Sequence, residues 1–224
     1  MPVTAVGFDL DETLAVTERA REKLLADATK AVGAPSLTRE EYLDAHSRHL
    51  TSDSRKPIFA DLLADGLGAD AEELTDAYQQ AILDSLASVG DIPSLLSELH
   101  REYRLGLLTN GPVEAQRGKL HQLGWEEYFD ATVVTGELEA GKPDRRAFDA
   151  LCERLDVRPE EMVYIGDNPE ADIRGASDIG MKTIQVLFPD GPEPEPSADA
   201  YVDREELVSA LPGIIAELAE RNED

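Results

Sequence analysis

The chain has 224 residues, enough for one α/β domain that carries a smaller insertion. Hydrophobic residues make up 42% of it and can fill a sizeable core, which excludes a disordered chain. Acidic residues outnumber basic ones 47 to 21, a net charge of −26. Such a surface repels other polyanions, so we expect neither nucleic acid nor an anionic membrane as a partner.

The acidic excess has two interpretations, because it is spread along the whole chain. One is an ordinary acidic protein of the cytoplasm. The other is adaptation to molar salt, where a Debye length of about 3 Å screens self-repulsion and a high net charge keeps the protein in solution. Only six of the 21 basic residues are lysine, which agrees with the second interpretation, and we favour it.

Localisation follows from what the chain lacks. No apolar run approaches the roughly 18 residues of a membrane-spanning helix, and the first predicted strand begins close to Met1, which leaves no room for a signal peptide. The single cysteine, Cys152, has no partner for a disulfide, and its apolar-spaced surroundings predict a core position. We therefore expect a cytoplasmic protein, and its oligomeric state stays open.

The first part of the chain predicts one strand followed by helices. Residues 2–14 form an apolar run that ends in carboxylates, which is typical of a buried parallel strand. From residue 18 to 88, apolar residues recur every three or four positions without any strand signal. Thr38 and Glu41 form a candidate capping box. The predicted helices span 18–32, 38–50, 57–67 and 71–89.

Beyond Gly90 the pattern changes to alternating helices and strands. Predicted helices cover 91–103, 112–124, 143–155, 170–180 and 205–220, and predicted strands cover 103–109, 131–135, 162–167, 182–188 and 200–202. This alternation predicts βαβ units and a parallel sheet covered on both faces. The proline-rich segment 189–200 predicts an extended surface connection without a functional role.

These elements predict an α/β fold with two parts. Residues 1–14 and 91–224 would form a doubly wound, Rossmann-like parallel-sheet core, and residues 15–90 an all-helical cap inserted after the first strand.

The first chemical motif is DLDET, at the end of the first strand. Asp9 and Asp11 are two residues apart on that strand, so both side chains lie on one side, close enough to share a cation. A buried carboxylate pair is costly unless a metal neutralises it. The alternative is a helix N-cap, a role that these residue types also suit.

Three further clusters follow later predicted strands. Thr109 and Asn110 in TNGP offer a hydroxyl and free backbone amides at a helix start, a phosphate seat or an ordinary turn. Lys142 in GKPD places a charge on a stiff loop, or is a solvated lysine. Asp167 and Asp172 in GDNPEAD put carboxylates at the sheet edge, where Asp172 would equally complement a helix dipole.

Taken in this order, DLDET, TNG, GKPD and GDNPEAD resemble the motifs of the haloacid dehalogenase superfamily, over residues 1–14 and about 91–190. The helical insertion after the first motif resembles the small helical cap of one branch of that superfamily. The resemblance implies a magnesium-dependent phosphatase that hydrolyses a small phosphorylated metabolite through a phospho-aspartate intermediate.

The resemblance also implies roles for the motif residues. Asp9 would be the nucleophile, and Asp11 would protonate the leaving alkoxide and later deprotonate the attacking water. Mg²⁺ would be held by Asp9, by the main-chain carbonyl of Asp11 and by Asp167. Asp172 would lie behind these ligands, holding Lys142 or a metal-bound water.

Charge neutralisation at the phosphoryl oxygens would come from Lys142, the Thr109 hydroxyl and the Asn110 amide. Asp11 favours phosphoryl transfer over dehalogenation, because displacing a halide requires no acid. A phosphomutase is the alternative among enzymes, since these motifs also suit return of the phosphoryl group to substrate. A non-catalytic binding module is the alternative outside enzymes, but every polar position that the mechanism needs is filled.

The predicted cap carries a local cluster of basic residues: His46, Arg48, His49, Arg55 and Lys56. Against so acidic a background, this cluster is a candidate for contacting an anionic substrate tail, and the alternative is a solvated linker. The two histidines are three residues apart but lack a third metal ligand, so we expect them at the surface or facing substrate. The sequence leaves the identity of the phosphate ester open.

Overall fold

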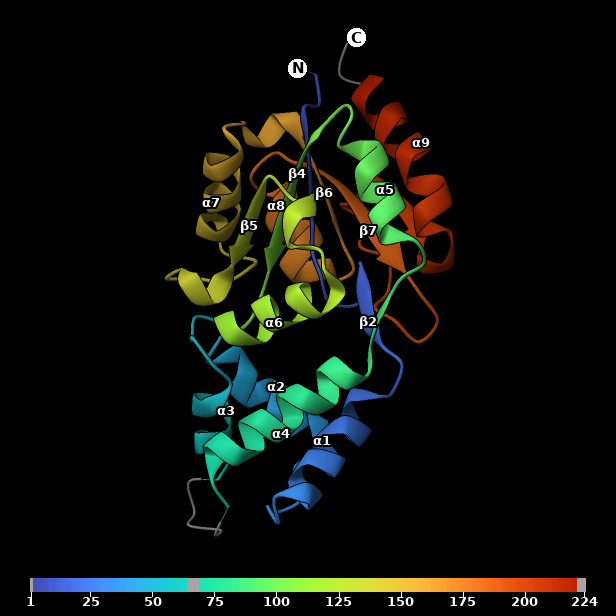
Figure 1. Ribbon diagram of the computed structural model, residues 1–224. Helices are drawn as coiled ribbons and strands as arrows, with labels where there is room; N and C mark the ends of the chain where they lie inside the picture. The colour runs from blue at the N-terminus through green and yellow to red at the C-terminus, as the bar shows by residue number, and fades with distance from the viewer. Residues whose placement is uncertain (1, 64–68, 221–224) are drawn as a thin grey trace.

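The structure, a computed structural model, describes residues 2–63 and 69–220. Figure 1 shows a larger unit, built around a sheet, above a smaller helical one. Six parallel strands form the sheet in the order β5-β4-β1-β6-β7-β8. They are β1 (Ala5–Phe8), β4 (Arg104–Thr109), β5 (Ala131–Val134), β6 (Met162–Gly166), β7 (Lys182–Leu187) and β8 (Ala200–Asp203).

The centre of the sheet determines where the motifs meet. Strand β1 lies between β4 and β6, with Val6 opposite Leu105 on one side and Val163 on the other. All three strands are apolar runs buried on both faces, as expected for central parallel strands. The chain builds the sheet outward in opposite directions from β1, and such a switch point leaves a crevice at the carboxyl ends of the strands.

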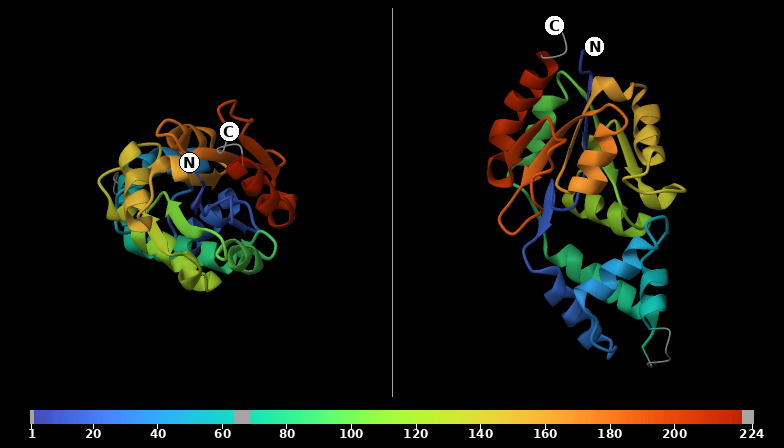
Figure 2. Two further views of the ribbon diagram at one scale, coloured as in Figure 1. Left: turned by 90° about the horizontal axis from the view of Figure 1, so that it is seen from above. Right: turned by 180° about the vertical axis from the view of Figure 1, so that it is seen from behind.

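Helices cover both faces of the sheet, as Figure 2 shows. On one face, a hydrophobic core joins the strands to α5 (Ile92–Leu99), α6 (Val113–Leu123) and α9 (Leu207–Glu220). On the other face, a second core joins them to α7 (Arg145–Leu155) and α8 (Gly175–Ser177). The prediction of a doubly wound core is confirmed, and Cys152 lies buried in the second core as expected.

Short helical turns complete the larger unit. One of them, η4, is a π-helical turn that directly follows the GDN motif at the end of β6. These turns are η1 (Glu126–Tyr128), η2 (Thr135–Glu137), η3 (Pro159–Glu161), η4 (Pro169–Arg174) and η5 (Arg204–Glu206).

The smaller unit is the predicted helical cap, with a hydrophobic core of its own built around Tyr42, Phe59 and Tyr78. The Thr38 side chain caps its second helix and exchanges hydrogen bonds with Glu41, so the predicted capping box is confirmed. The cap helices are α1 (Arg21–Ala31), α2 (Arg39–Ser47), α3 (Lys56–Leu62) and α4 (Ala71–Asp84). Residues 64–67 of the predicted helix 57–67 lie outside the described residues.

The prediction that no strand occurs between residues 18 and 88 was wrong. The last cap helix ends at Asp84, and β3 (Leu86–Ser88) pairs antiparallel with β2 (Ala15–Thr17). This two-stranded ribbon joins the two chain segments that connect cap and core. The two strands are some 70 residues apart in the sequence, so the spacing of apolar residues within a short window cannot reveal that they pair. The boundaries 1–14, 15–90 and 91–224 stay a prediction.

The proline-rich segment 189–200, predicted as an extended surface connection, is attached to the core. Glu195 is buried, its carboxylate pairs with Arg174 at 2.8 Å, and its backbone N–H donates to Gln185 Oε1 at 2.6 Å. The segment is therefore anchored at its middle to β7 and to the turn after β6.

None of the helices within 2–63 and 69–220 is long and apolar enough to span a bilayer.

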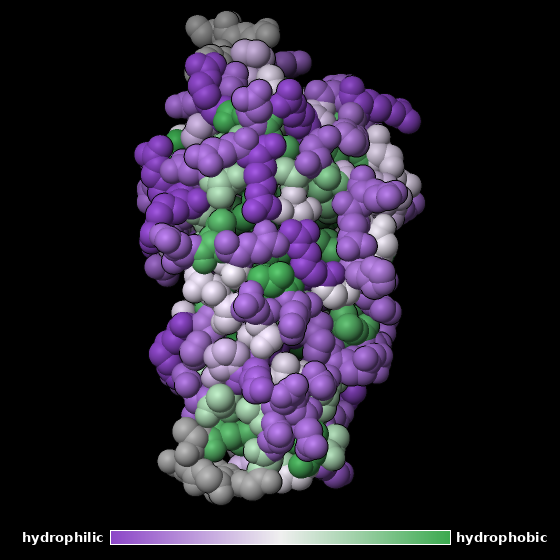
Figure 3. Space-filling view, turned by 60° about the vertical axis from the view of Figure 1, so that its left-hand side comes forward, coloured by the Kyte–Doolittle hydropathy of each residue, from purple (hydrophilic) through white to green (hydrophobic). Residues whose placement is uncertain are grey.

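Hydrophilic side chains cover most of the face drawn in Figure 3, over both the core and the cap. With a net charge of −26, this surface repels itself in dilute buffer, where screening is weak.

We predict that the melting temperature rises steadily from dilute buffer to about 2 M potassium chloride, because salt shortens the Debye length to a few ångströms. Thermal unfolding should be followed with and without saturating magnesium, since cations bound at one acidic site would saturate early. A melting temperature that does not change with salt would rule out adaptation to molar salt.

Candidate active site

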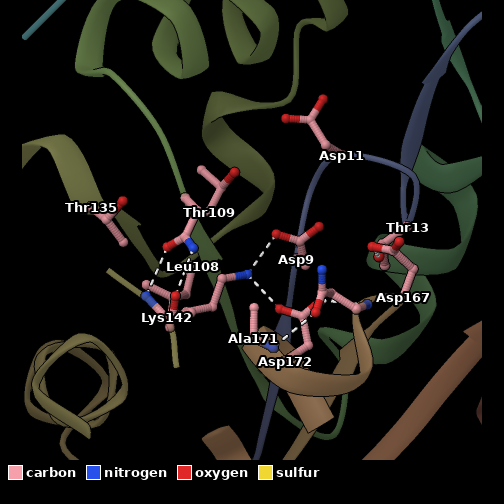
Figure 4. Close-up of polar contacts among 12 residues, drawn as sticks. Asp9, Asp11, Thr13, Leu108, Thr109, Thr135, Lys142, Asp167, Ala171 and Asp172 are labelled. Atoms are coloured by element: carbon pink, nitrogen blue, oxygen red, sulfur yellow. Dashed lines mark hydrogen bonds and ion pairs between the residues drawn. The ribbon is translucent and has the colours of Figure 1, made fainter. Parts of the chain in front are cut away.

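The motifs meet at the carboxyl ends of the three central strands, as Figure 4 shows. Asp9 directly follows β1, Thr109 is the last residue of β4, and Asp167 directly follows β6. The Asp9 backbone N–H donates to the carbonyl of Ile165 at 2.9 Å, which continues the β1–β6 pairing up to the site. Three of the four clusters expected at strand ends therefore lie there, and the fourth, GKPD, lies on the loop between η2 and α7.

Lys142 lies at the centre of this arrangement. Its Nζ is 2.6 Å from Asp9 Oδ1, 2.6 Å from Asp172 Oδ1 and 3.0 Å from the Tyr164 hydroxyl, and the side chain is almost completely buried. Burial opposes the ammonium charge, but the Asp172 and Asp9 carboxylates raise the pKa of Lys142 well above its usual value. Lys142 is therefore a permanent positive charge beside Asp9, not a solvated surface lysine.

Two neighbours position Lys142, one of which the sequence analysis missed. The Asn110 side chain donates to the Lys142 carbonyl at 2.9 Å and accepts from the Lys142 N–H at 2.8 Å, so it clamps the loop that carries the lysine. The Tyr164 hydroxyl donates to the carbonyl of Leu108 at 2.9 Å and is thereby oriented toward the ammonium. Tyr164 carried no motif signal, because an apolar strand such as β6 commonly contains tyrosine.

The acidic side of the site fits a divalent cation. Asp9, Asp167 and Asp172 each offer a carboxylate oxygen, and these atoms lie within 4.8 Å of one another. Burial raises the pKa of Asp9 to about 7 against the opposing Lys142 charge, and burial, Asp172 and Asp9 raise that of Asp167 to about 9. Lys142 contacts two of these three carboxyl groups, and carboxyl oxygens are the ligands that Mg²⁺ prefers.

Asp172 lies within this cluster of candidate ligands, whereas the sequence predicted it behind them. Its Oδ2 accepts from the Asn168 N–H at 2.9 Å, while Oδ1 holds Lys142 as predicted. Glycine is required at position 166, because a Cβ there would lie 2.4 Å from the Asp172 Cγ. A side chain at that position would displace the carboxylate.

The Asp11 carboxylate, in contrast, turns away from Asp9 (Figure 4). It accepts from Lys119 Nζ at 2.7 Å, from Arg21 Nη2 at 2.9 Å and from Gln116 Nε2 at 3.0 Å. Burial would raise the pKa of Asp11, but Lys119 and Arg21 hold it well below its usual range. The carboxylate is not part of the metal cluster, and coordination through the Asp11 carbonyl stays a prediction.

Helix α6, which supplies Gln116 and Lys119, begins against the cap. Its first backbone N–H groups, on Val113 and Glu114, donate to the Ser52 and Asp53 carbonyls at 3.1 and 2.9 Å. The expectation that amides at this helix start are free for phosphate was therefore wrong for these two, because a cap loop closes onto them. Lys119 was missed as well, although the spacing of Gln116 and Lys119 places both on one helix face.

A cavity of about 390 Å³ lies between cap and core, in the size range of a small-metabolite site. Of the predicted cap residues, His46 and Arg55 line it. The other three do not. They have partners elsewhere on the cap: Arg48 forms an ion pair with Asp44, Lys56 forms one with Glu72 at 2.7 Å, and the His49 ring lies within hydrogen-bond distance of Asp61, at 2.8 Å.

The cavity lining also contains Arg21, Arg39 and Tyr78 of the cap, none of which the sequence analysis selected. Every predicted core residue lines it: Asp9, Asp11, Thr109, Asn110, Lys142, Asp167 and Asp172. Thr109 Oγ1 accepts from Gln116 Nε2 at 2.9 Å, so its hydroxyl is fixed at the cavity wall.

Comparison with known proteins shows the family of this chain. A model of the family described as haloacid dehalogenase-like hydrolase matches residues 6–186. The glyceraldehyde 3-phosphate phosphatase of Methanopyrus kandleri is 32% identical over 82% of this chain and 84% of its own. The N-acylneuraminate-9-phosphatase of Mus musculus is 31% identical over 86% and 85%.

Among solved structures, a HAD phosphatase from Thermococcus onnurineus superposes with a TM-score of 0.68 at 28% identity, over 94% of this chain and 99% of that one. The family match covers most of the chain, and the relatives span cap and core alike. The chain therefore belongs to the haloacid dehalogenase-like hydrolases, as a hydrolase of phosphate esters.

Proposed function

We propose that this protein is a magnesium-dependent phosphatase that hydrolyses a small phosphate monoester through a phosphorylated Asp9. The observation that carries the proposal is the position of Asp9, at the end of β1 and beside both Lys142 and the carboxylates of the metal cluster. Relatives named for glyceraldehyde 3-phosphate and for N-acylneuraminate-9-phosphate are both similar to this chain, so sequence similarity alone does not identify the ester that it hydrolyses.

In the first step, an Asp9 carboxylate oxygen attacks phosphorus as the bond from phosphorus to the ester oxygen breaks. Lys142 and the Thr109 hydroxyl line the same cavity and would offset the charge on the phosphoryl oxygens. The departing alkoxide takes a proton from Asp11. In the second step, Asp11 accepts a proton from water, whose oxygen attacks phosphorus and releases phosphate and the Asp9 carboxylate.

Asp11 must leave its present partners to act as an acid. Lys119 and Arg21 favour its ionised form, and a carboxylate has no proton to donate. A bound phosphate ester brings negative charge that competes for these two cations, which frees Asp11 to take up a proton. The acid role therefore depends on exchange of ion pairs when substrate enters.

Asp9, Asp167 and Asp172 would hold the metal ion. When bound, Mg²⁺ supplies positive charge that offsets the repulsion between Asp9 and the phosphoryl group. Lys142 remains necessary, because its ammonium favours the ionised form of Asp9 and holds the side chains of Asp9 and Asp172 at one place.

The nucleophile is tested by Asp9→Asn, which keeps the shape of the side chain and removes its nucleophilic oxygen. We predict that hydrolysis of an aryl phosphate falls by at least about 10³-fold, while circular dichroism shows an unchanged fold. Trapping of phosphate on the native protein, but not on this variant, would locate the intermediate. Activity close to that of the native protein would refute the mechanism.

The acid is tested by Asp11→Asn with two kinds of ester. Alkyl phosphates need a proton on the leaving oxygen, so their kcat should fall by about 10²- to 10⁴-fold. Aryl phosphates leave as stable phenolates, so their kcat should fall much less. Equal losses for both kinds would assign Asp11 a positioning role instead.

The metal site is tested by Asp167→Asn in thermal unfolding. In the presence of a chelator, the variant should melt close to the native protein at pH 7, because the pKa of Asp167 is raised to about 9 and its carboxyl group is already uncharged there. Magnesium should then raise the melting temperature of the native protein far more than that of the variant.

The control for this experiment is Asp84→Asn, which makes the same change of charge at an exposed position on α4. Its response to magnesium should match that of the native protein. A native melting temperature that magnesium leaves unchanged would contradict the metal site.

A further inference from the structure

The cap side of the cavity is rich in positive charge, although the chain as a whole is strongly acidic. Arg21, Arg39 and Arg55 of the cap line it, and Lys119 of the core helix α6 lines the cavity beside them. With only 21 basic residues against 47 acidic ones, four cations on one small surface need a local reason. Cations that a protein gathers in a buried cavity repel one another unless an anion lies between them.

Arg39 and Arg55 form no ion pair with any carboxylate in the described part of the chain. Each is instead held by neutral cap side chains, which are aromatic for both arginines, and Arg55 Nη1 also donates to Gln79 Oε1. The Arg55 Nε donates to the Tyr42 hydroxyl at 3.0 Å and its guanidinium lies 5.5 Å from the centre of the Tyr78 ring. The Arg39 guanidinium lies 5.1 Å from the centre of the Tyr42 ring and donates to the Tyr78 hydroxyl at 3.4 Å.

This arrangement fixes both guanidinium groups without neutralising them. Arg55 is only 6% exposed, so its charge is almost fully removed from water. A buried charge is costly unless it is paired, and cation–π contacts with neutral phenols offset only part of that cost. The two side chains are therefore preorganised for an anion that is not part of the protein.

The nearby carboxylates are already engaged. Asp11 is shared by Arg21 and Lys119, at 2.9 and 2.7 Å. Glu12, the other acidic residue on this part of the lining, pairs with Arg204 at 2.9 Å. Neither compensates Arg39 or Arg55.

The pKa of His46 is affected by its burial and by this excess of positive charge. It lines the cavity and stacks on the Tyr42 ring, with ring centres 5.8 Å apart. Burial lowers its pKa to about 4, and Arg55 and Arg39 add to the effect. His46 is therefore neutral at pH 7 and adds a hydrogen-bonding group rather than another charge.

We propose that the substrate is a small phosphate monoester with a second anionic group, a carboxylate or another phosphate, which Arg39 and Arg55 bind while the ester phosphate lies at Asp9. The proposal rests on the proposed phosphatase function and narrows its substrate class. A cavity of about 390 Å³ leaves room for a short carbon chain between the two anionic groups.

The test compares matched esters that differ in one anionic group. For the carboxylate, the pair is 3-phosphoglycerate and glycerol 3-phosphate. For the phosphate, it is fructose 1,6-bisphosphate and fructose 6-phosphate. In at least one pair, the ester with the extra anion should have the higher kcat/KM by about 10- to 100-fold, the range of a charge-assisted hydrogen bond. The pair with the larger ratio identifies the anion.

Variants assign this preference to the two arginines. Arg39→Gln and Arg55→Gln should each reduce the kcat/KM ratio within the preferred pair to near one. The matched controls are Arg48→Gln and Lys56→Gln, which remove a cap cation that pairs outside the cavity and should preserve the ratio. If Arg55→Gln does not fold because its site is buried, the partly exposed Arg39 still decides the question.

Binding provides a measurement that does not depend on turnover. In an Asp9→Asn background, calorimetry should show tighter binding of the doubly anionic ester, and Arg39→Gln should abolish that difference. Ratios near one in both pairs, with aryl phosphate hydrolysis intact, would overturn the second anion site and leave the phosphatase function standing. Absence of magnesium-dependent hydrolysis of every ester would refute the phosphatase function, and the calorimetric difference would then decide the anion site alone.

Discussion

The buried ammonium of Lys142 is the interaction on which the site depends. It joins Asp9, which follows the first strand, to Asp172, more than 160 residues later in the chain, through two contacts of 2.6 Å. Removing one partner of such a buried pair costs about 3–5 kcal/mol, because an uncompensated charge stays behind. Asn110 and Tyr164 hold the lysine from a third and a fourth segment, so the four motifs form one electrostatic unit.

That unit could be predicted from the sequence because its geometry follows from the parallel sheet. Once β1, β4 and β6 are recognised as strands, their carboxyl ends share one edge, and the polar residues directly after them have to meet there. That Asp9, Thr109 and Asp167 lie together could therefore be predicted from the strands alone. The cap was also predictable as four helices, since its apolar spacing is local. Its ribbon was not, because antiparallel pairing of residues 15–17 with 86–88 is a long-range event.

The residues that were not predicted were missed for one physical reason. Arg21, Arg39 and Lys119 lie on helices, and which face of a helix meets the cavity depends on how cap and core dock. Basic residues on helices are normally solvated, so their sequence context is uninformative. Arg48 and Lys56 illustrate the reverse error, because their place in a basic cluster suggested a substrate contact, whereas each pairs with a nearby carboxylate on the cap surface.

Helix α6 connects the two halves of the cavity. Its first amides donate to cap carbonyls at Ser52 and Asp53, and two turns further on Lys119 reaches Asp11 in the core. A cap that moved away would leave those amides unpaired and would withdraw Arg21 from Asp11, so the electrostatic state of Asp11 depends on closure. An anion that draws Arg39 and Arg55 toward the core favours the same closed state. Substrate recognition by the cap is thereby coupled to the ionisation of Asp11, and within the closed state the bound phosphate still has to compete for Arg21 and Lys119.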